Sequence, residues 1–271
     1  MEPILEIDDF GQEHPNGLGI TFQHIVWSAL RHRPRRFWVN ITKPNNPYRE
    51  AGRGENVWDY YFDQPAPDGP TEPCPIELPL DVPLSGHRDW TTERQRAIQP
   101  FAAEHFKLRA EIQAEVDSFK AQFFRGNVLA LHCRGSDKIS EYQPMRGDRL
   151  LAQVNALRER LRPDVLFLMT DDVFYHNLFA PMGVVSLTIP RSNLSLHHNP
   201  PCGPAMSGRW VVMDAWLAAS ARWFAYTPSN TATIPIVMGK HDELIRLNEH
   251  CEIFPFCPRV DRVLGITSGG A

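Results

Sequence analysis

Four short apolar runs in the second half of the chain constrain its fold more than any other feature. They are VLALHC at 128–133, VLFLMT at 165–170, VVSLTI at 184–189 and RWFAYT at 222–227. Each run has the length and the β-branched or aromatic content of a buried strand. Helical patterns lie between them, notably at 148–161 and 209–221. Strands that alternate with helices predict an α/β fold with a parallel sheet.

A proline-rich stretch separates this region from the first part of the chain. Seven of the 24 prolines lie between Pro65 and Pro83. Each proline removes a backbone N–H donor and biases the residue before it away from the helical region. The stretch is therefore predicted to be neither a helix nor an interior strand. We predict two domains, residues 1–98 and residues 99–271.

The flanks of the proline-rich stretch carry patterns of their own. Apolar residues at helical spacing over 22–30 precede the aromatic and β-branched run RFWVNI at 36–41. This order predicts a helix followed by a strand. Beyond the prolines, apolar residues step by threes, fours and sevens from Phe101 to Phe123, which predicts one long amphipathic helix.

The composition excludes several classes of protein. Lys and Arg number 28 and Asp and Glu 32, so the formal net charge is −4 and a nucleic-acid partner is not expected. No segment approaches the roughly 20 apolar residues of a membrane span, and the N-terminus lacks the pattern of a signal peptide. The five cysteines are an odd number with no C-x-x-C pair, which argues against a disulfide framework. A cytoplasmic location is expected.

Polar residues follow each of the four predicted strands. In an open parallel sheet, ligands bind beyond the carboxyl ends of the strands, where loops and helix starts converge. Here these ends offer cations, hydroxyls and amides, the groups that bind phosphate. A nucleotide or diphosphate is therefore the expected ligand. The polar segments are HCRGSDK at 132–138, Thr170–Asp172, Arg191–Asn193 and Thr227–Thr231.

The common phosphate and hydrolase motifs do not occur. There is no G-x-x-x-x-G-K-[ST], and Gly17 and Gly19 are followed by Phe22 where a dinucleotide site has its third glycine. No H-E-x-x-H or G-x-S-x-G is found either. These absences argue against an NAD enzyme, a P-loop NTPase, a zincin and an α/β-hydrolase.

Two short groups of residues raise the question of a metal site. Asp171 and Asp172 are adjacent carboxylates without further ligand spacing, a pattern that is common at helix caps. His197, His198 and Cys202 lie in a polar, proline-rich loop, where an ordinary exposed loop is the stronger interpretation. We predict no metal site.

Three motifs together resemble the metal-independent superfamily of α1,6-fucosyltransferases and protein O-fucosyltransferases, which has the GT-B fold. They occur in the family's order: His132-Cys133-Arg134-Gly135-Ser136-Asp137-Lys138 with Glu141, then Thr170-Asp171-Asp172, then Arg209 and Asp214 with Thr227-Pro228-Ser229-Asn230. The resemblance covers about residues 128–238, with a looser likeness at Gly17–Gly19. The chain departs from the family at Gly135, where a second Arg is frequent, and in a Lys138 to Glu141 spacing that is one residue shorter.

The resemblance implies an α/β, GT-B-like fold of two Rossmann-like halves with parallel sheets. Its implied activity is that of an inverting fucosyltransferase, with GDP-fucose as donor substrate and no cofactor. Residues 1–98 would form the acceptor side, and residues 99–271 would bind the nucleotide sugar. The acceptor would be a hydroxyl group of a glycan or a peptide.

The catalytic roles that the resemblance implies fall on the first motif. Arg134 would pair with the β-phosphate of GDP-fucose, on which negative charge grows as fucose leaves. Glu141 would take the proton from the acceptor hydroxyl, with Lys138 and Asp137 as positioning residues. A solvated loop carboxylate is an equally good interpretation of Glu141, and Asp137 is the alternative base.

Donor-binding roles fall on all three motifs. Asp214 would accept hydrogen bonds from N1 and N2 of guanine, since a carboxylate in an apolar helix needs a partner. The other candidates have structural alternatives: a core histidine, a helix cap or a helix-surface charge. They are His132 for donor oxygens, Asp172, Arg209 for the nucleotide, and Ser229, Asn230 and Thr231 for phosphate.

Two alternatives remain open at this point. The donor can be another nucleotide sugar, because the guanine contacts come from likeness. The protein can also be a nucleotide-sugar-binding protein without catalysis, because Gly135 and the Glu141 spacing depart from the family pattern.

Overall fold

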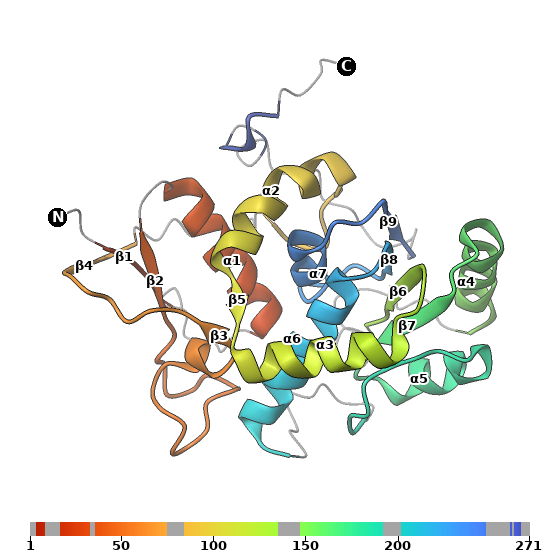
Figure 1. Cartoon of the computed structure of the whole chain (residues 1–271), viewed down its shortest axis with the longest axis horizontal. Coiled ribbons are helices and arrows are strands. Elements are labelled where there is room, and N and C mark those ends of the chain that lie inside the picture. Colours follow the sequence, from red (N-terminus) through yellow and green to blue (C-terminus); the bar gives the residue numbers. More distant parts are fainter. Residues whose placement is uncertain are drawn as a thin grey trace.

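The structure is a computed structural model that describes residues 4–8, 17–32, 36–74, 84–134, 147–191, 202–247, 261 and 263–266. Each half of the chain contains a parallel sheet (Figure 1). The predicted α/β class with parallel sheets is confirmed. Among the described residues, no helix has the length and apolar character needed to cross a membrane.

The N-terminal sheet has three parallel strands in the order β2-β1-β4. Helix α1 (Leu18–His32) precedes β2, which confirms the predicted helix and strand. Strand β4 falls inside the proline-rich stretch but lies at the edge of the sheet, where a missing N–H donor is tolerated. The strands are β1 (Ile4–Asp8), β2 (Phe37–Asn40) and β4 (Thr71–Pro73).

The single long helix predicted from Phe101 to Phe123 is wrong. Two helices, α2 (Thr92–His105) and α3 (Ala110–Phe123), flank the short strand β5 (Lys107–Leu108). β5 pairs antiparallel with β3 (Phe62–Asp63), which follows the 3-10 helix η1 (Val57–Tyr60). The apolar side chains that suggested one helical stripe therefore belong to three different elements.

The C-terminal sheet has four parallel strands in the order β7-β6-β8-β9. Helices connect each of these strands to the next one along the chain. The strands are β6 (Val128–His132), β7 (Val165–Met169), β8 (Trp223–Tyr226) and β9 (Glu243–Arg246). The helices are α4 (Asp148–Leu161), α5 (Val173–Phe179), the 3-10 helix η3 (Ala180–Met182), α6 (Pro204–Ala219) and α7 (Thr233–Met238).

The strand predicted at 184–189 is also wrong. Only Val185 forms a β-bridge, to Phe167, and the chain then leaves the sheet. The Leu187 and Ile189 carbonyl oxygens accept hydrogen bonds from the Arg191 side chain instead of from a strand. The fourth strand is β9, which the sequence analysis did not predict.

Aromatic and aliphatic side chains join the two halves in one buried cluster. Phe22 of α1 lies 6.3 Å from Trp58, 5.3 Å from Phe106 and 6.0 Å from Trp216 of α6, measured between ring centroids. Figure 1 places α1 and α7 between the two sheets. Helix α2 crosses the predicted boundary between residues 98 and 99. The division into two domains stays a prediction.

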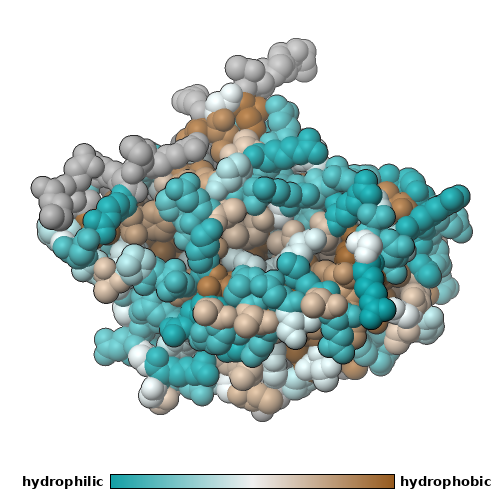
Figure 2. All heavy atoms as spheres, in the orientation of Figure 1, coloured by the Kyte–Doolittle hydropathy of each residue, from teal (hydrophilic) through white to brown (hydrophobic). Residues whose placement is uncertain are grey.

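Hydrophilic residues cover much of the face shown in Figure 2, with smaller hydrophobic areas among them. The apolar side chains of the core are enclosed by the packed helices and sheets. This distribution is typical of a folded domain in water.

Candidate functional site

The ends of β6, β7 and β8 meet at one edge of the C-terminal sheet. His132, the last residue of β6, is in register with the last residues of the two neighbouring strands. Thr227 Oγ1 accepts a hydrogen bond from the Arg134 backbone N–H at 2.8 Å. Thr170 Oγ1 donates to the Cys133 carbonyl oxygen at 2.8 Å. The polar residues that follow these strands therefore lie together, as the strand pattern indicated.

Arg134 is positioned at this edge by an ion pair. Its Nη1 donates to Asp171 Oδ2 at 3.1 Å, and both side chains are only 12% exposed. A charged pair this sheltered is screened less than one at the surface. The guanidinium is thus directed toward the loop that ends β7.

Asp214 is buried in the middle of α6, with 4% of its surface exposed. Burial raises its pKa well above that of an ordinary carboxyl; Arg191 lowers it and Asp171 raises it further. Its Oδ1 atom has no hydrogen-bond partner among the described residues. A buried acceptor without a donor is costly, so this oxygen is a candidate ligand contact.

Arg191 interacts electrostatically with both Asp214 and Asp171. Its Nη2 donates to the Leu187 carbonyl oxygen at 2.8 Å, and its Nε donates to the Thr170 carbonyl oxygen at 3.2 Å. Burial lowers its pKa, whereas Asp214 and Asp171 raise it. In the sequence, Arg191 is marked only as a polar residue after a predicted strand, and no local pattern connects it with Asp214.

His132 and Ser229 contact each other. The His132 Nε2 and Ser229 Oγ atoms are 2.7 Å apart, and Ser229 Oγ also accepts from the Ala232 N–H at 3.1 Å. Burial, reinforced by Arg134, lowers the pKa of His132 to about 4. His132 is therefore uncharged at neutral pH, and Ser229 caps the turn that leads into α7.

The N-terminal half supports this turn at Asn230. Asn230 Oδ1 accepts hydrogen bonds from Gln23 Nε2 at 3.3 Å and from Ser85 Oγ at 3.0 Å. A Cβ atom on Gly19 would lie 2.6 Å from the Asn230 backbone, and one on Gly86 would lie 2.0 Å from the Ser229 carbonyl oxygen. The Gly17–Gly19 region therefore matters here because Gly19 lets α1 approach the turn.

Gly19→Ala is expected to lower the stability of the protein. Alanine is the better helix former, but its Cβ would overlap backbone atoms, and overpacking of this kind costs about 1 to 3 kcal/mol. Gly17→Ala is the control, because its Cβ would meet only the Tyr48 hydroxyl at 4.0 Å. Thermal unfolding checks the pair of variants; equal melting temperatures for both would contradict the close approach.

Two other predicted residues have structural partners. Asp172, 1% exposed, is the N-cap of α5, and its Oδ1 accepts from the Phe174 N–H at 2.8 Å. Arg209 pairs with Glu115 of α3 at 2.7 Å and borders a hollow of about 390 Å³ between α3 and α6. These contacts match the structural alternatives named above, a helix cap for Asp172 and a helix-surface charge for Arg209. Their roles in binding stay predictions.

Asp137, Lys138 and Glu141 lie outside the described residues, as do His197 and His198. Within the described part of the chain, no three His, Cys, Asp or Glu side chains are grouped as a metal would need.

Comparison with known proteins identifies the fold. No protein-family model matches the chain, and no curated protein is significantly similar in sequence. The crystal structure of the fucosyltransferase NodZ from Bradyrhizobium matches 92% of this chain and 98% of that chain, with a TM-score of 0.57 and 14% identity. The chain has the fold of a fucosyltransferase. The resemblance inferred from three motifs is confirmed at this level.

Two further NodZ structures of this fold come from crystals prepared with a nucleotide. NodZ α-1,6-fucosyltransferase co-crystallized with GDP has a TM-score of 0.52, and NodZ soaked with GDP-fucose has one of 0.50. Each match is 14% identical and covers 88% of this chain and 93% of that chain. At this identity the likeness concerns the fold, and the residues of the site need their own argument.

Proposed function

We propose that the protein is an inverting glycosyltransferase that transfers L-fucose from GDP-fucose to a hydroxyl group of a glycan or a peptide. The observation that carries this proposal is the arrangement at the sheet edge. Arg134 and the turn at 229–231 follow the neighbouring strands β6 and β8. The buried carboxyl of Asp214 interacts electrostatically with Asp171, which follows β7. These residues occur in the order of the family motifs. The fold, shared with NodZ structures that were co-crystallized with GDP or soaked with GDP-fucose, supports the proposal.

The diphosphate would lie between Arg134 and the 229–231 turn. Arg134 provides a planar set of donors for two phosphate oxygens, and backbone N–H groups of the turn add others. In the free protein Asp171 balances the Arg134 charge. As the bond to fucose breaks, charge grows on the β-phosphate, and donors fixed in place stabilise that charge.

The base of the nucleotide would be read by Asp214. Its unpartnered Oδ1 requires an N–H donor, and guanine presents two of them, N1–H and N2–H, on one edge. Adenine has no N–H at position 1, and uracil offers a single one. A carboxylate in this buried position therefore favours GDP over ADP and UDP.

The proposed transfer breaks the bond between the anomeric carbon and the β-phosphate oxygen. The acceptor oxygen forms the new bond from the opposite face, which inverts the configuration. Glu141 is the proposed base that takes the acceptor proton, and Asp137 is the alternative. GDP leaves with the bonding electron pair, and no cofactor takes part.

A donor panel tests the proposal. Release of the nucleoside diphosphate is measured with each of three donors, as GDP from GDP-fucose and GDP-mannose and as UDP from UDP-glucose. Each donor is tested with and without a mixture of glycan and peptide acceptors. We expect acceptor-stimulated release from GDP-fucose above the other donors. Stimulated release from another donor only would change the donor assignment. Binding of GDP-fucose without any release would identify a binding protein.

The activity is expected to persist in EDTA. Arg134 and backbone amides would supply the positive potential that a cation provides in metal-dependent transferases. Release of GDP is compared in buffer, in EDTA and in EDTA with excess manganese or magnesium. Loss in EDTA together with rescue by either cation would overturn the metal-independent mechanism.

A further inference from the structure

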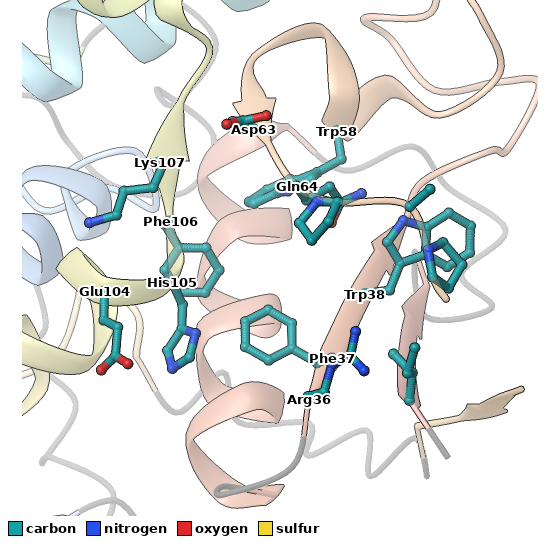
Figure 3. A pocket seen from close by; sticks show the side chains of 14 residues that line it. Arg36, Phe37, Trp38, Trp58, Asp63, Gln64, Glu104, His105, Phe106 and Lys107 are labelled. Atoms are coloured by element: carbon teal, nitrogen blue, oxygen red, sulfur yellow. The ribbon is translucent and has the colours of Figure 1, made fainter. Parts of the chain in front are cut away.

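A second hollow lies beside β2, in the N-terminal half (Figure 3). Its volume is about 360 Å³, within the range of roughly 300 to 1,000 Å³ typical of ligand pockets. Its lining comes from β1, β2 and η1, from the segment 63–67, and from the end of α2 with β5. None of these elements contributes to the 229–231 turn or to Arg134 and Asp214.

The position of this hollow also differs from that of the candidate nucleotide site. Ile4 and Phe37, which line it, are the first residues of β1 and β2. The start of α1, by contrast, packs at Gly19 against the turn at Asn230. The hollow therefore lies toward the amino ends of the N-terminal strands.

Aromatic side chains form much of its wall. The Phe37 ring lies 5.9 Å from the Phe106 ring and 5.2 Å from His105, measured between centroids, and Figure 3 shows the three grouped together. Trp58 closes the hollow, and Trp38 lies on the opposite side of β2 from that group. Phe37 and Trp38 are partly exposed, so a ligand can stack on them.

The charges on the rim are balanced. Arg36 and Lys107 are positive, Asp63 and Glu104 are negative, and all four are exposed. Arg36 also pairs with Asp68 outside the hollow at 2.8 Å. A rim with two charges of each sign does not favour a phosphate, a polyamine or another ligand of one sign. It offers both donors and acceptors to a neutral polar molecule.

Backbone groups of β2 add to this polar lining. The Leu5 N–H donates to the Arg36 carbonyl oxygen at 2.9 Å, so alternate residues of β2 bond to β1. The N–H and C=O groups of Phe37 and Val39 consequently face the outer edge. Among the described residues, the Phe37 backbone has no hydrogen-bond partner at that edge, and Phe37 lines the hollow.

Side-chain amides close the rest of this edge. Gln64 Oε1 accepts from the Val39 N–H at 3.0 Å, and Gln64 Nε2 donates to the Val39 carbonyl oxygen at 2.7 Å. Asn56 Oδ1 accepts from the Ile41 N–H at 2.8 Å. A peptide strand cannot add to an edge blocked in this way, so the occupant is not an added β-strand.

We propose that this hollow binds a neutral oligosaccharide, one pyranose ring of which stacks on Phe37 while a neighbouring ring contacts Trp38 on the other side of β2. A pyranose combines a flat C–H face, which suits an aromatic wall, with a ring of hydroxyl groups that donate and accept. The rim side chains and the Phe37 backbone would bind those hydroxyls. The site would hold a glycan apart from the hydroxyl that reacts, and its existence does not depend on the transfer activity.

Cellotetraose is a suitable probe, because its equatorial hydroxyls leave flat apolar ring faces. Isothermal titration calorimetry on the whole protein measures its affinity. Phe37→Leu and Trp38→Leu remove an aromatic face while keeping an apolar side chain, and each is expected to weaken binding about tenfold or more. Phe101→Leu is the control, since Phe101 lies 6.5 Å from Phe37 but does not line the hollow.

The outcomes separate this site from the nucleotide site. We expect GDP affinity to stay unchanged in all three variants, and circular dichroism to confirm that they fold. If Phe37→Leu does not fold, Trp38→Leu decides. No binding of cellotetraose or maltotetraose at millimolar concentration would overturn the proposal, as would binding that both variants leave unchanged.

Discussion

Arg134→Ala is expected to lower turnover with GDP-fucose by about 100- to 1,000-fold and to weaken GDP binding at the same time. The guanidinium would contact the diphosphate before the reaction and more strongly as charge develops on the β-phosphate. The ion pair with Asp171 already positions it at the sheet edge, at 3.1 Å. Turnover is measured by GDP release, and binding by calorimetry on the same preparation.

Arg134→Lys separates geometry from charge. Lysine keeps the positive charge but cannot provide two parallel donors, so we expect partial GDP binding and a rate well below wild type. Arg160→Ala is the matched control, because Arg160 forms an exposed ion pair with Glu243 and such pairs contribute little to stability. Wild-type turnover in Arg134→Lys would contradict the bidentate role.

Asp214→Asn is expected to weaken GDP binding by about ten- to a hundredfold while leaving UDP binding almost unchanged. The amide retains one acceptor oxygen, but it loses the charge that strengthens hydrogen bonds from N1–H and N2–H. Asp242→Asn is the control, since Asp242 pairs with Arg222 at the surface. The measurement is calorimetry with both nucleotides. An equal loss for GDP and UDP would show that Asp214 supports the site without reading the base.

Asp214 also predicts that the affinity for the base depends on pH. Guanosine is the suitable ligand, because it carries no phosphate group that titrates. Burial raises the pKa of Asp214 in the free protein, and a guanine edge with two N–H donors prefers the carboxylate. Guanosine affinity should therefore fall as the pH is lowered through this raised pKa. His132 does not supply this dependence, because its pKa is lowered to about 4. In Asp214→Asn the profile should be flat.

Part of the fold was readable because buried strands have a simple pattern. The strands β6, β7 and β8 are apolar except for His132 at the end of β6, and all their residues except Val165 are buried. β1 carries Glu6 and Asp8, and β9 is only half-buried at every position, so neither showed that pattern. The run at 184–189 has strand composition, but the carbonyl oxygens of Leu187 and Ile189 bond to the Arg191 side chain.

The site was predictable to the extent that strand ends determine it. The register of the sheet brings Arg134, Thr170 and Thr227 together. Arg134 directly follows the predicted strand 128–133, and Thr170 and Thr227 are the last residues of the predicted strands 165–170 and 222–227. The contacts of Asn230 with Gln23 and Ser85 connect residues more than 140 positions apart, which no local pattern encodes. Contacts of this kind depend on how the two halves pack.

Calorimetry of the wild-type protein with GDP, UDP and ADP tests the central claim most directly, namely that this sheet edge is a guanine nucleotide site. Asp214 should favour the two N–H donors of guanine, and Arg134 should bind the diphosphate common to all three ligands. We predict that GDP binds at least about tenfold more tightly than UDP or ADP. Equal affinities for the three nucleotides, or no binding of GDP, would contradict the account.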